Sequence, residues 1–399
     1  MRALVNRASR RPPSLLCHQR HHSGSVNEFR HNLATDEWVV FSSARRGRPV
    51  QLRQYPKSVR VSQLESHDSE CPFCKGNEHM SPEPTLCMKA PDGSWLLRVV
   101  PNLYPAVTPP PAVLESSVQP VDDEADRSGN YFNLASVPAV GFHEVVVEGP
   151  EHNIPSALAP LTSVKALVHA LQSRGRAMLT MGSTLRHIMY FKNSGLKAGA
   201  SLLHPHSQIL GLPILPNEVA RRQRHARTWY RNFRRNVFDD TIDETLKERD
   251  RALLASGVDG AKHRVVLEDD LFVCFVPYAA LSPFSLWIVP KRAGEAHFHE
   301  ASDETLDAFA QCLHAALRKL HFGLDEPDFN LVIRSAALET GAMSIYRSEL
   351  FFRWYCLIVP RLGVGAMGGF EFSTGIQSNS SMPEDDAAFL RSVDVEPCL

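Results

Sequence analysis

The stretch "AGASLLHPHSQILGLPILP", residues 198–216, places two histidines and a glutamine at alternate positions of an otherwise apolar run. In an extended chain, successive side chains point to opposite faces. His204, His206 and Gln208 therefore project together. Because two imidazoles and a carboxamide make a poor hydrophobic core, the stretch predicts a strand that carries a functional site. The opposite face of this strand would carry Leu203, Pro205, Ser207 and Ile209.

The chemistry of these three side chains suits phosphoryl transfer. Neutral imidazole is a competent nucleophile near pH 7, because its pKa lies close to that pH. A glutamine two residues further on can donate a hydrogen bond to a phosphoryl oxygen as charge develops there. A lone histidine on such a strand would more often be a satisfied core residue. The second histidine and Gln208 are what favour a site.

A second group of reactive side chains lies in "CPFCKGNE", which begins at Cys71. Two thiolates separated by two residues match half of a tetrahedral zinc site, which needs two further ligands. His152 and His204 are candidates for them, and a ligand at His204 would fix the strand that carries His206. The spacing of Cys71 and Cys74 is equally compatible with a redox pair or with coincidence.

Outside these motifs, the chain alternates between short strands and long amphipathic helices. The run "HEVVVEGPEH" alternates as a half-buried strand does, and Val164, Leu167 and Leu171 recur at helical spacing. The expected elements are strands over 37–43, 95–107, 143–152 and 189–195 with a helix over 161–188, then strands within 263–292, a helix over 303–322, and strands over 328–336 and 351–362.

The two halves of the chain repeat this order in outline. When they are aligned, "FKNSG" meets "FNLVIRS" and "HPHSQILGLPILP" meets "RWYCLIVP". We therefore expect a duplicated unit in which only the first copy keeps its polar centre. The expected division is a leader over 1–27, a catalytic first half with the zinc site over 28–216, a basic helical linker over 217–262, and a second half without catalytic histidines over 263–399.

Composition narrows the class of protein. With 399 residues, 43% of them apolar, the chain can bury one large core or two linked ones. A net charge of -1 argues against a general polyanion binder. Eight cysteines are too sparse for a disulfide scaffold and suit a reducing compartment with one metal site. No apolar run is long enough to span a bilayer, so no membrane partner is expected.

The segment from Glu218 to Asn236 is very basic. Its seven arginines, interleaved with Trp229, Tyr230 and Phe233, could bind phosphates or RNA by charge and stacking. Such a run is more often a solvated helix face with its aromatic residues turned inward. Since the whole chain lacks a basic excess, we expect no nucleic-acid partner.

The first segment, "MRALVNRASRRPPSLLCHQRHHSG", carries five arginines and no acidic residue. This composition is typical of a transit peptide and predicts a mitochondrial or plastid location. The alternative is a disordered extension without an address, which would leave the protein cytoplasmic. In either case residues 1–27 are not expected to belong to the fold.

Taken together, these motifs resemble the galactose-1-phosphate uridylyltransferase family, the duplicated branch of the histidine triad superfamily, which includes ADP-glucose phosphorylase. The resemblance runs from about Phe29 to Leu390. It implies an α+β fold of two histidine-triad-like repeats, with a mainly antiparallel sheet flanked by helices. The motifs that carry it, in the family's order, are "RHNLATDEWVVFSSARRGRP", "CPFCKGNE", "VVPNLYPAV", "EGPEHN", "FKNSGLKAGASLLHPHSQI", "FSLWIVPKR" and "GGFEFSTG".

The resemblance also implies roles for single residues. His206 would attack the α-phosphorus of a sugar nucleotide and form a covalent nucleotidyl-histidine. Gln208 would hold the phosphoryl oxygens, with Ser207 beside them. Zn²⁺ would be the cofactor, bound by Cys71, Cys74, His152 and His204. Substrate-binding positions matched in the same way are Arg45, Arg48, Asn102, Asn193, Gly369, Phe370 and Glu371.

The second copy departs from the family pattern. Many members carry an "HWH" type motif in its closing strand, which contributes to a second metal site. Here the corresponding residues are Arg353, Trp354 and Tyr355, so a second metal site of that kind is not expected.

Three functions remain open on this sequence. The first is uridylyl transfer between a sugar nucleotide and a hexose-1-phosphate in galactose metabolism, which family prevalence puts narrowly first. The second is phosphorolysis of ADP-glucose with inorganic phosphate as the acceptor. The third is a sugar-nucleotide-binding protein without catalysis, which has no need of the intact "HPHSQ" motif. The expected partners are sugar nucleotide, with sugar-1-phosphate or phosphate, and a second copy of the chain in a homodimer.

Overall fold

The computed structural model describes residues 27–42, 59–109, 139–181, 185–338, 347–362 and 368–395. The proposed leader, apart from its last residue, and the two matched arginines Arg45 and Arg48 lie outside these ranges. None of the described helices is long and apolar enough to cross a membrane.

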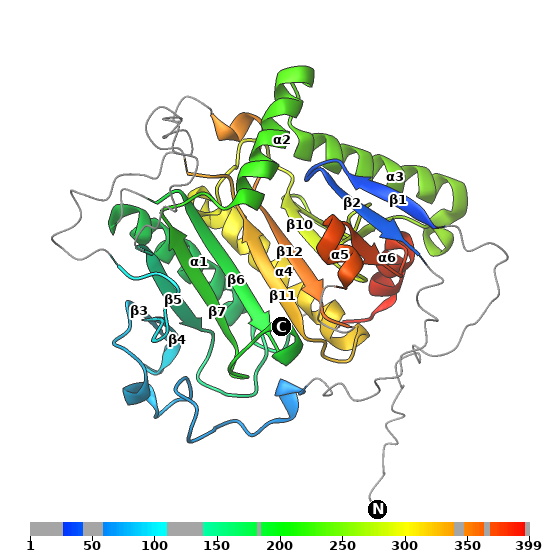
Figure 1. Cartoon of the computed structure of the whole chain (residues 1–399). Helices are drawn as coiled ribbons and strands as arrows, with labels where there is room; N and C mark the ends of the chain where they lie inside the picture. Colours follow the sequence, from blue (N-terminus) through cyan, green and yellow to red (C-terminus); the bar gives the residue numbers. More distant parts are fainter. Residues whose placement is uncertain are drawn as a thin grey trace, which may run out of the picture.

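The centre of the fold is a ten-stranded sheet in which every neighbouring pair of strands is antiparallel. Its spatial order is β3-β4-β5-β7-β6-β11-β12-β10-β9-β8 (Figure 1). The predicted α+β class with a mainly antiparallel sheet is therefore confirmed. The strands are β3 Leu86–Lys89, β4 Trp95–Pro101, β5 Phe142–Val147, β6 His187–Ser194, β7 His206–Leu212, β8 Val265–Glu268, β9 Phe272–Phe275, β10 Leu286–Pro290, β11 Phe329–Arg334 and β12 Tyr355–Pro360.

The sheet is built from two halves with the same internal order. They meet where β6 pairs with β11, with Tyr190 opposite Ile333. Moving outward from this seam, β7, β5, β4 and β3 follow on one side, and β12, β10, β9 and β8 on the other. Each inner strand follows a long helix in the chain, α1 (Leu161–Met181) before β6 and α4 (Asp303–Gly323) before β11. The alignment of the two halves in sequence predicts this repetition.

Helices α1 and α4 pack against each other and cover one face of the sheet. Alternate residues of the central strands supply the core beneath them, among them Tyr190 and Ile209. Helix α4 begins where its Ser302 side chain accepts a hydrogen bond from the Thr305 backbone N–H, the usual capping arrangement. Helix α1 ends at Met181, and β6 begins at His187, so the helix expected over 161–188 extended too far. The apolar residues at its predicted end belong to the period-two pattern of β6.

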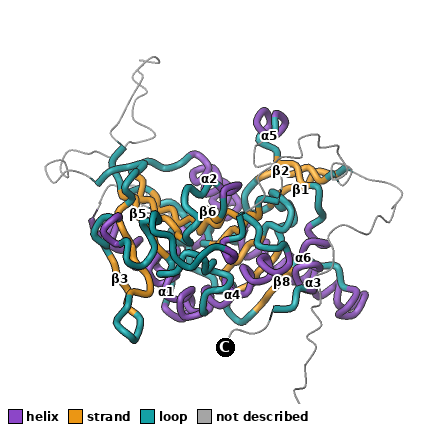
Figure 2. Tube along the Cα trace, turned by 90° about the horizontal axis from the view of Figure 1, so that it is seen from below, coloured by secondary structure: helices purple, strands orange, loops and turns teal. Residues whose placement is uncertain are grey.

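In the second half of the sheet, the face opposite to α1 and α4 is covered by other helices and strands. Helices α2 (Asn217–Phe233) and α3 (Val237–Gly260) lie there with the hairpin of β1 (Glu28–Asn32) and β2 (Glu37–Phe41). Strand β13 (Gln377–Asn379) pairs in parallel with β2, and the short helices α5 (Gly369–Thr374) and α6 (Pro383–Ser392) flank it in the chain. Figure 2 shows α5 and this hairpin on the side of the sheet away from α1 and α4.

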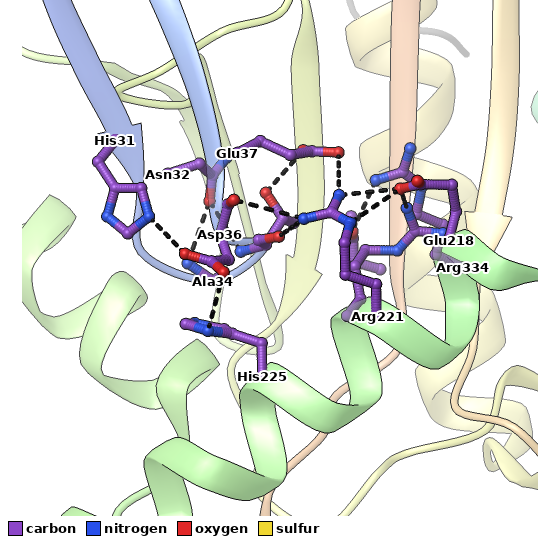
Figure 3. Close-up of polar contacts among 12 residues, drawn as sticks. His31, Asn32, Ala34, Asp36, Glu37, Glu218, Arg221, His225 and Arg334 are labelled. Carbon is purple, nitrogen blue, oxygen red and sulfur yellow. Dashed lines mark hydrogen bonds and ion pairs between the residues drawn. The ribbon is translucent and has the colours of Figure 1, made fainter. Parts of the chain in front are cut away.

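The basic segment of α2 has protein partners in this layer (Figure 3). Arg221 donates to the Glu37 carboxylate of the hairpin and to Glu218 of its own helix. Trp229 donates its indole N–H to Asp240 at the start of α3. These side chains hold the covering layer together. In the described part of the chain, no helix lies over this face of β5 and β7 (Figure 1). The segment that carries Cys71, Phe73 and Cys74 packs there against Val145 and Val147.

Candidate active site

Strand β7 presents His206 in the form that a nucleophile requires. Its Nδ1 lies 2.8 Å from the backbone oxygen of His204. Because a carbonyl oxygen only accepts, Nδ1 carries the proton and Nε2 carries the free lone pair. Burial lowers the pKa of His206, and the nearby Lys192 ammonium lowers it further. The imidazole is therefore held neutral, with one nitrogen free to attack phosphorus.

Gln208 lies two residues further along the same face of β7. Its Oε1 is 2.9 Å from Nε2 of His143 on β5. Sequence reasoning did not single out His143. Its place in an alternating strand was visible, but only the pairing of β5 with β7 brings it beside Gln208.

Four predicted metal ligands converge in one buried cluster. The donor atoms of Cys71, Cys74, His152 and His204 all lie within 4.8 Å of one another. Cys74 Sγ is 3.4 Å from His152 Nδ1 and 3.6 Å from His204 Nδ1. A tetrahedral zinc ion with ordinary bond lengths sets sulfur and nitrogen ligands about 3.5 Å apart. The donor set and its spacing therefore fit a metal ion of this kind.

Outer contacts orient these ligands. His204 donates from Nε2 to the backbone oxygen of Gly149 at 2.9 Å, which leaves Nδ1 as the coordinating nitrogen. Burial lowers the pKa of His204 to about 4, so the ring is in its neutral, ligating form. Burial, together with the neighbouring Cys74, raises the pKa of the Cys71 thiol to about 11. A cation at the centre would favour the thiolate form of both cysteines.

A buried ion pair anchors β7 from the helix-covered side. Glu148 Oε1 accepts from Lys192 Nζ at 2.7 Å and from Ser207 Oγ at 2.6 Å. Burial alone would raise the pKa of Glu148, but the Lys192 ammonium and the hydroxyl donors outweigh it, so the pKa lies below its usual value. The Ser207 hydroxyl is thus engaged on the side of the strand opposite to Gln208. In this structure it fixes the strand and does not point toward the expected phosphoryl position.

Replacing Lys192 with methionine is expected to lower the free energy of unfolding by about 3–5 kcal/mol, because the Glu148 carboxylate would remain buried without its counter-charge. Folding lowers the pKa of Glu148. The stabilisation by the Glu148–Lys192 pair is therefore present at neutral pH, and it is lost as the pH falls through the folded-state pKa of Glu148. Urea denaturation at pH 7 measures the change.

Lys165→Met is the matched control. Lys165 pairs with Asp307 at a partly exposed position, so its removal should lower the free energy of unfolding by less than about 1 kcal/mol. Equal losses in the two variants would contradict the anchoring role of Lys192.

The structure brings two of the matched substrate-binding residues close to this site. Asn102 follows β4, and its Nδ2 lies 3.1 Å from His143 Nε2. Asn193 on β6 lines the same cavity as His206, and its Oδ1 accepts from Asn330 at 2.8 Å. Gly369, Phe370 and Glu371 instead form the start of α5, which projects from the surface beside the hairpin (Figure 2).

The residues that stand in place of the "HWH" motif make contacts that stabilise the fold. Arg353 is buried and donates to the backbone oxygen of Pro290 and to Asp239. Trp354 packs in the main core, and Tyr355 accepts a hydrogen bond from Arg334. This part of the second half is filled by packing and an ion pair.

Comparison with known proteins identifies the family of this chain. The family model for the N-terminal domain of galactose-1-phosphate uridyl transferase matches residues 18–216. ADP-glucose phosphorylase of Arabidopsis thaliana is 31% identical over 367 residues, covering 92% of this chain and 93% of that protein. The chain belongs to the galactose-1-phosphate uridylyltransferase family. Galactose-1-phosphate uridylyltransferase of Thermotoga maritima is 27% identical and covers 92% of this chain and 99% of its own length.

The solved structures place the chain in the same family. The crystal structure of the Arabidopsis thaliana ADP-glucose phosphorylase with bound ADP-glucose has a TM-score of 0.73 and 27% identity. It covers 93% of this chain and the whole of that one. Both the resemblance and the fold class predicted from the sequence are confirmed. Since the named members of the galactose-1-phosphate uridylyltransferase family are a phosphorylase and uridylyltransferases, the predicted enzyme class is confirmed for the family.

Proposed function

We propose that the protein transfers a nucleoside monophosphate from a sugar nucleotide through a covalent intermediate on His206. The observation that carries the proposal is the hydrogen bond from His206 Nδ1 to the His204 carbonyl, which leaves Nε2 as the nucleophile. Nε2 attacks the α-phosphorus, the bond to the bridging oxygen breaks, and sugar-1-phosphate leaves. An oxygen of the acceptor phosphate then attacks the same phosphorus and restores the imidazole.

For the substrate we infer ADP-glucose, with inorganic phosphate as the acceptor. Family prevalence alone places uridylyl transfer first. The higher identity to the Arabidopsis thaliana phosphorylase and the similarity to its ADP-glucose complex support the adenylyl reaction. Uridylyl transfer to hexose-1-phosphate uses the same step at His206 and is the alternative.

An assay of four donor and acceptor pairs tests this choice. UDP-glucose and ADP-glucose are each combined with galactose-1-phosphate and with phosphate. Fast turnover of ADP-glucose with phosphate is expected. Turnover confined to UDP-glucose with galactose-1-phosphate would favour the uridylyl alternative, and inactivity of all four pairs would favour a binding protein without catalysis.

Zinc is the metal that we propose for the buried cluster, because two cysteines and two histidines at tetrahedral spacing are its typical ligands. A bound ion would cross-link the "CPFC" turn, the segment after β5 and the segment that leads into β7, where His204 lies two residues before the strand begins. Its proposed role is to hold these segments in place. The nucleotidyl transfer itself is carried by His206 and its neighbours.

Gln208→Ala is expected to slow nucleotidyl transfer by roughly a hundredfold or more, the usual effect of removing one donor to a developing oxyanion. The strand itself should stay folded, since Gln208 is only partly buried. Single-turnover kinetics with excess enzyme measure the rate. A rate within about threefold of the wild type would remove Gln208 from the mechanism.

A homodimer is proposed as the assembly. Helix α5 projects from the surface with Phe372 83% exposed and Phe370 38% exposed. Apolar side chains gathered on a projecting helix are surface that a second copy of the chain would cover. Light scattering of the purified protein measures the mass.

A further inference from the structure

His143 lies at the junction of three polar groups on the face of the sheet opposite to α1 and α4. Its Nδ1 is 3.0 Å from the backbone nitrogen of Ala106. Its Nε2 is 2.9 Å from Gln208 Oε1 and 3.1 Å from Asn102 Nδ2. The loop after β4 and the strand β7 therefore meet at this one ring.

The backbone N–H of Ala106 decides the protonation of that ring. It can only donate, so His143 Nδ1 must accept, and the proton of a neutral imidazole must lie on Nε2. The Nε2–H of His143 in turn needs an acceptor. The Asn102 amide oxygen is already engaged by the Tyr104 N–H at 2.9 Å. The Asn102 amino group is a donor, so its 3.1 Å contact with the protonated Nε2 is not a hydrogen bond. Gln208 Oε1 is therefore the acceptor, whichever way the amide groups are first assigned.

The same hydrogen bond fixes the direction of the Gln208 carboxamide. With Oε1 held by His143, the amino group on Nε2 points the other way. The structure records no protein acceptor for this amino group within the described ranges. A carboxamide without such a partner can turn about its terminal torsion, which is broad and nearly two-fold. After that turn it would present an oxygen, and not a donor, to the phosphoryl group.

We propose that His143 is a positioning residue that sets Gln208 as a hydrogen-bond donor toward the phosphoryl group attacked by His206. The consequence for the reaction rests on the proposed function, whereas the tautomer and the direction of the amide do not. His143 acts only through Gln208 and does not itself touch the reacting atoms. Because the Ala106 N–H sets the tautomer of His143, Gln208 is correctly oriented only when the loop at Ala106 is ordered.

A double-mutant cycle tests the proposal kinetically. His143→Phe keeps a ring but removes both nitrogens, and it should slow formation of the nucleotidyl-enzyme at saturating sugar nucleotide about tenfold, part of the effect of losing Gln208 itself. His143→Gln offers an acceptor and a donor and should restore most of the rate. In a Gln208→Ala background, His143→Phe should change the rate by less than about twofold.

His169→Phe is the control. His169 lies on α1 and pairs with Asp307, outside β5 and β7, so this substitution should leave the rate unchanged. An equal slowing by His143→Phe with and without Gln208 would overturn the proposal, because a purely structural defect acts in both backgrounds. So would a His143→Phe variant as fast as the wild type.

A second measurement is independent of catalysis. Nitrogen-15 NMR of the histidine rings, with His143 assigned by comparison with His143→Gln, reports which ring nitrogen carries the proton. A proton on Nε2 is expected. A proton on Nδ1 overturns the proposal even if the enzyme is active, and inactivity toward every sugar nucleotide with the Nε2 proton in place would count against the proposed function alone.

Discussion

His206→Asn is expected to retain sugar-nucleotide binding and to lose turnover by several orders of magnitude. The wild-type ring donates from Nδ1 to the His204 carbonyl, and an asparagine amide can make the same hydrogen bond. It offers no nitrogen lone pair to replace Nε2, so the covalent step cannot occur. Turnover with ADP-glucose and phosphate measures the loss, and equilibrium binding of ADP-glucose measures what is kept.

His225→Asn is the control for this substitution. His225 lies on α2 and contacts the backbone oxygen of Leu33 in the hairpin, within the covering layer of Figure 3. It should keep wild-type turnover. If His206→Asn also turned over within about tenfold of the wild type, the nucleophile would have to be another group.

Cys74→Ser is expected to release the metal and to cause a large loss of folding free energy. Sγ of Cys74 is the atom to which both histidine contacts of the cluster are made. A structural zinc site contributes its binding energy to folding, which in small zinc-binding peptides reaches roughly 10–16 kcal/mol at pH 7. Elemental analysis should find about one zinc per wild-type chain and far less in the variant, with a much lower melting temperature.

Cys87→Ser provides the matched control, because Cys87 is an exposed thiol on β3. It should keep both the metal and the melting temperature. Metal-replete wild-type protein without zinc, or a Cys74→Ser variant as stable as Cys87→Ser, would show that the four side chains do not form a structural metal site.

The sequence was sufficient for those parts of the site that depend on spacing along one strand or one turn. Period-two alternation put His206 and Gln208 on one face, and the separation of Cys71 and Cys74 indicated half of a metal site. The family resemblance implied two repeats with a mainly antiparallel sheet, but it did not give the order of the strands. Local patterns could thus locate the proposed nucleophile but not its surroundings.

Contacts across the sheet could not be predicted in this way. His143 meets Gln208, and Glu148 meets Lys192, only because β5 and β6 both pair with β7. Each of these residues alone is compatible with an ordinary polar position on a half-buried strand. The same limit applies to α2, whose arginines gave no sign that Arg221 would bridge to Glu37 in the distant hairpin.

The most direct test of the account is peptide mapping of the wild-type protein after incubation with isotopically labelled ADP-glucose in the absence of acceptor. A phosphoramidate on histidine is labile in acid and stable in base, so the digest must be kept alkaline. A nucleoside monophosphate adduct is expected on the peptide that contains His206, and it should be lost when phosphate is added. Turnover without any adduct, or an adduct on a peptide that lacks His206, would contradict the account.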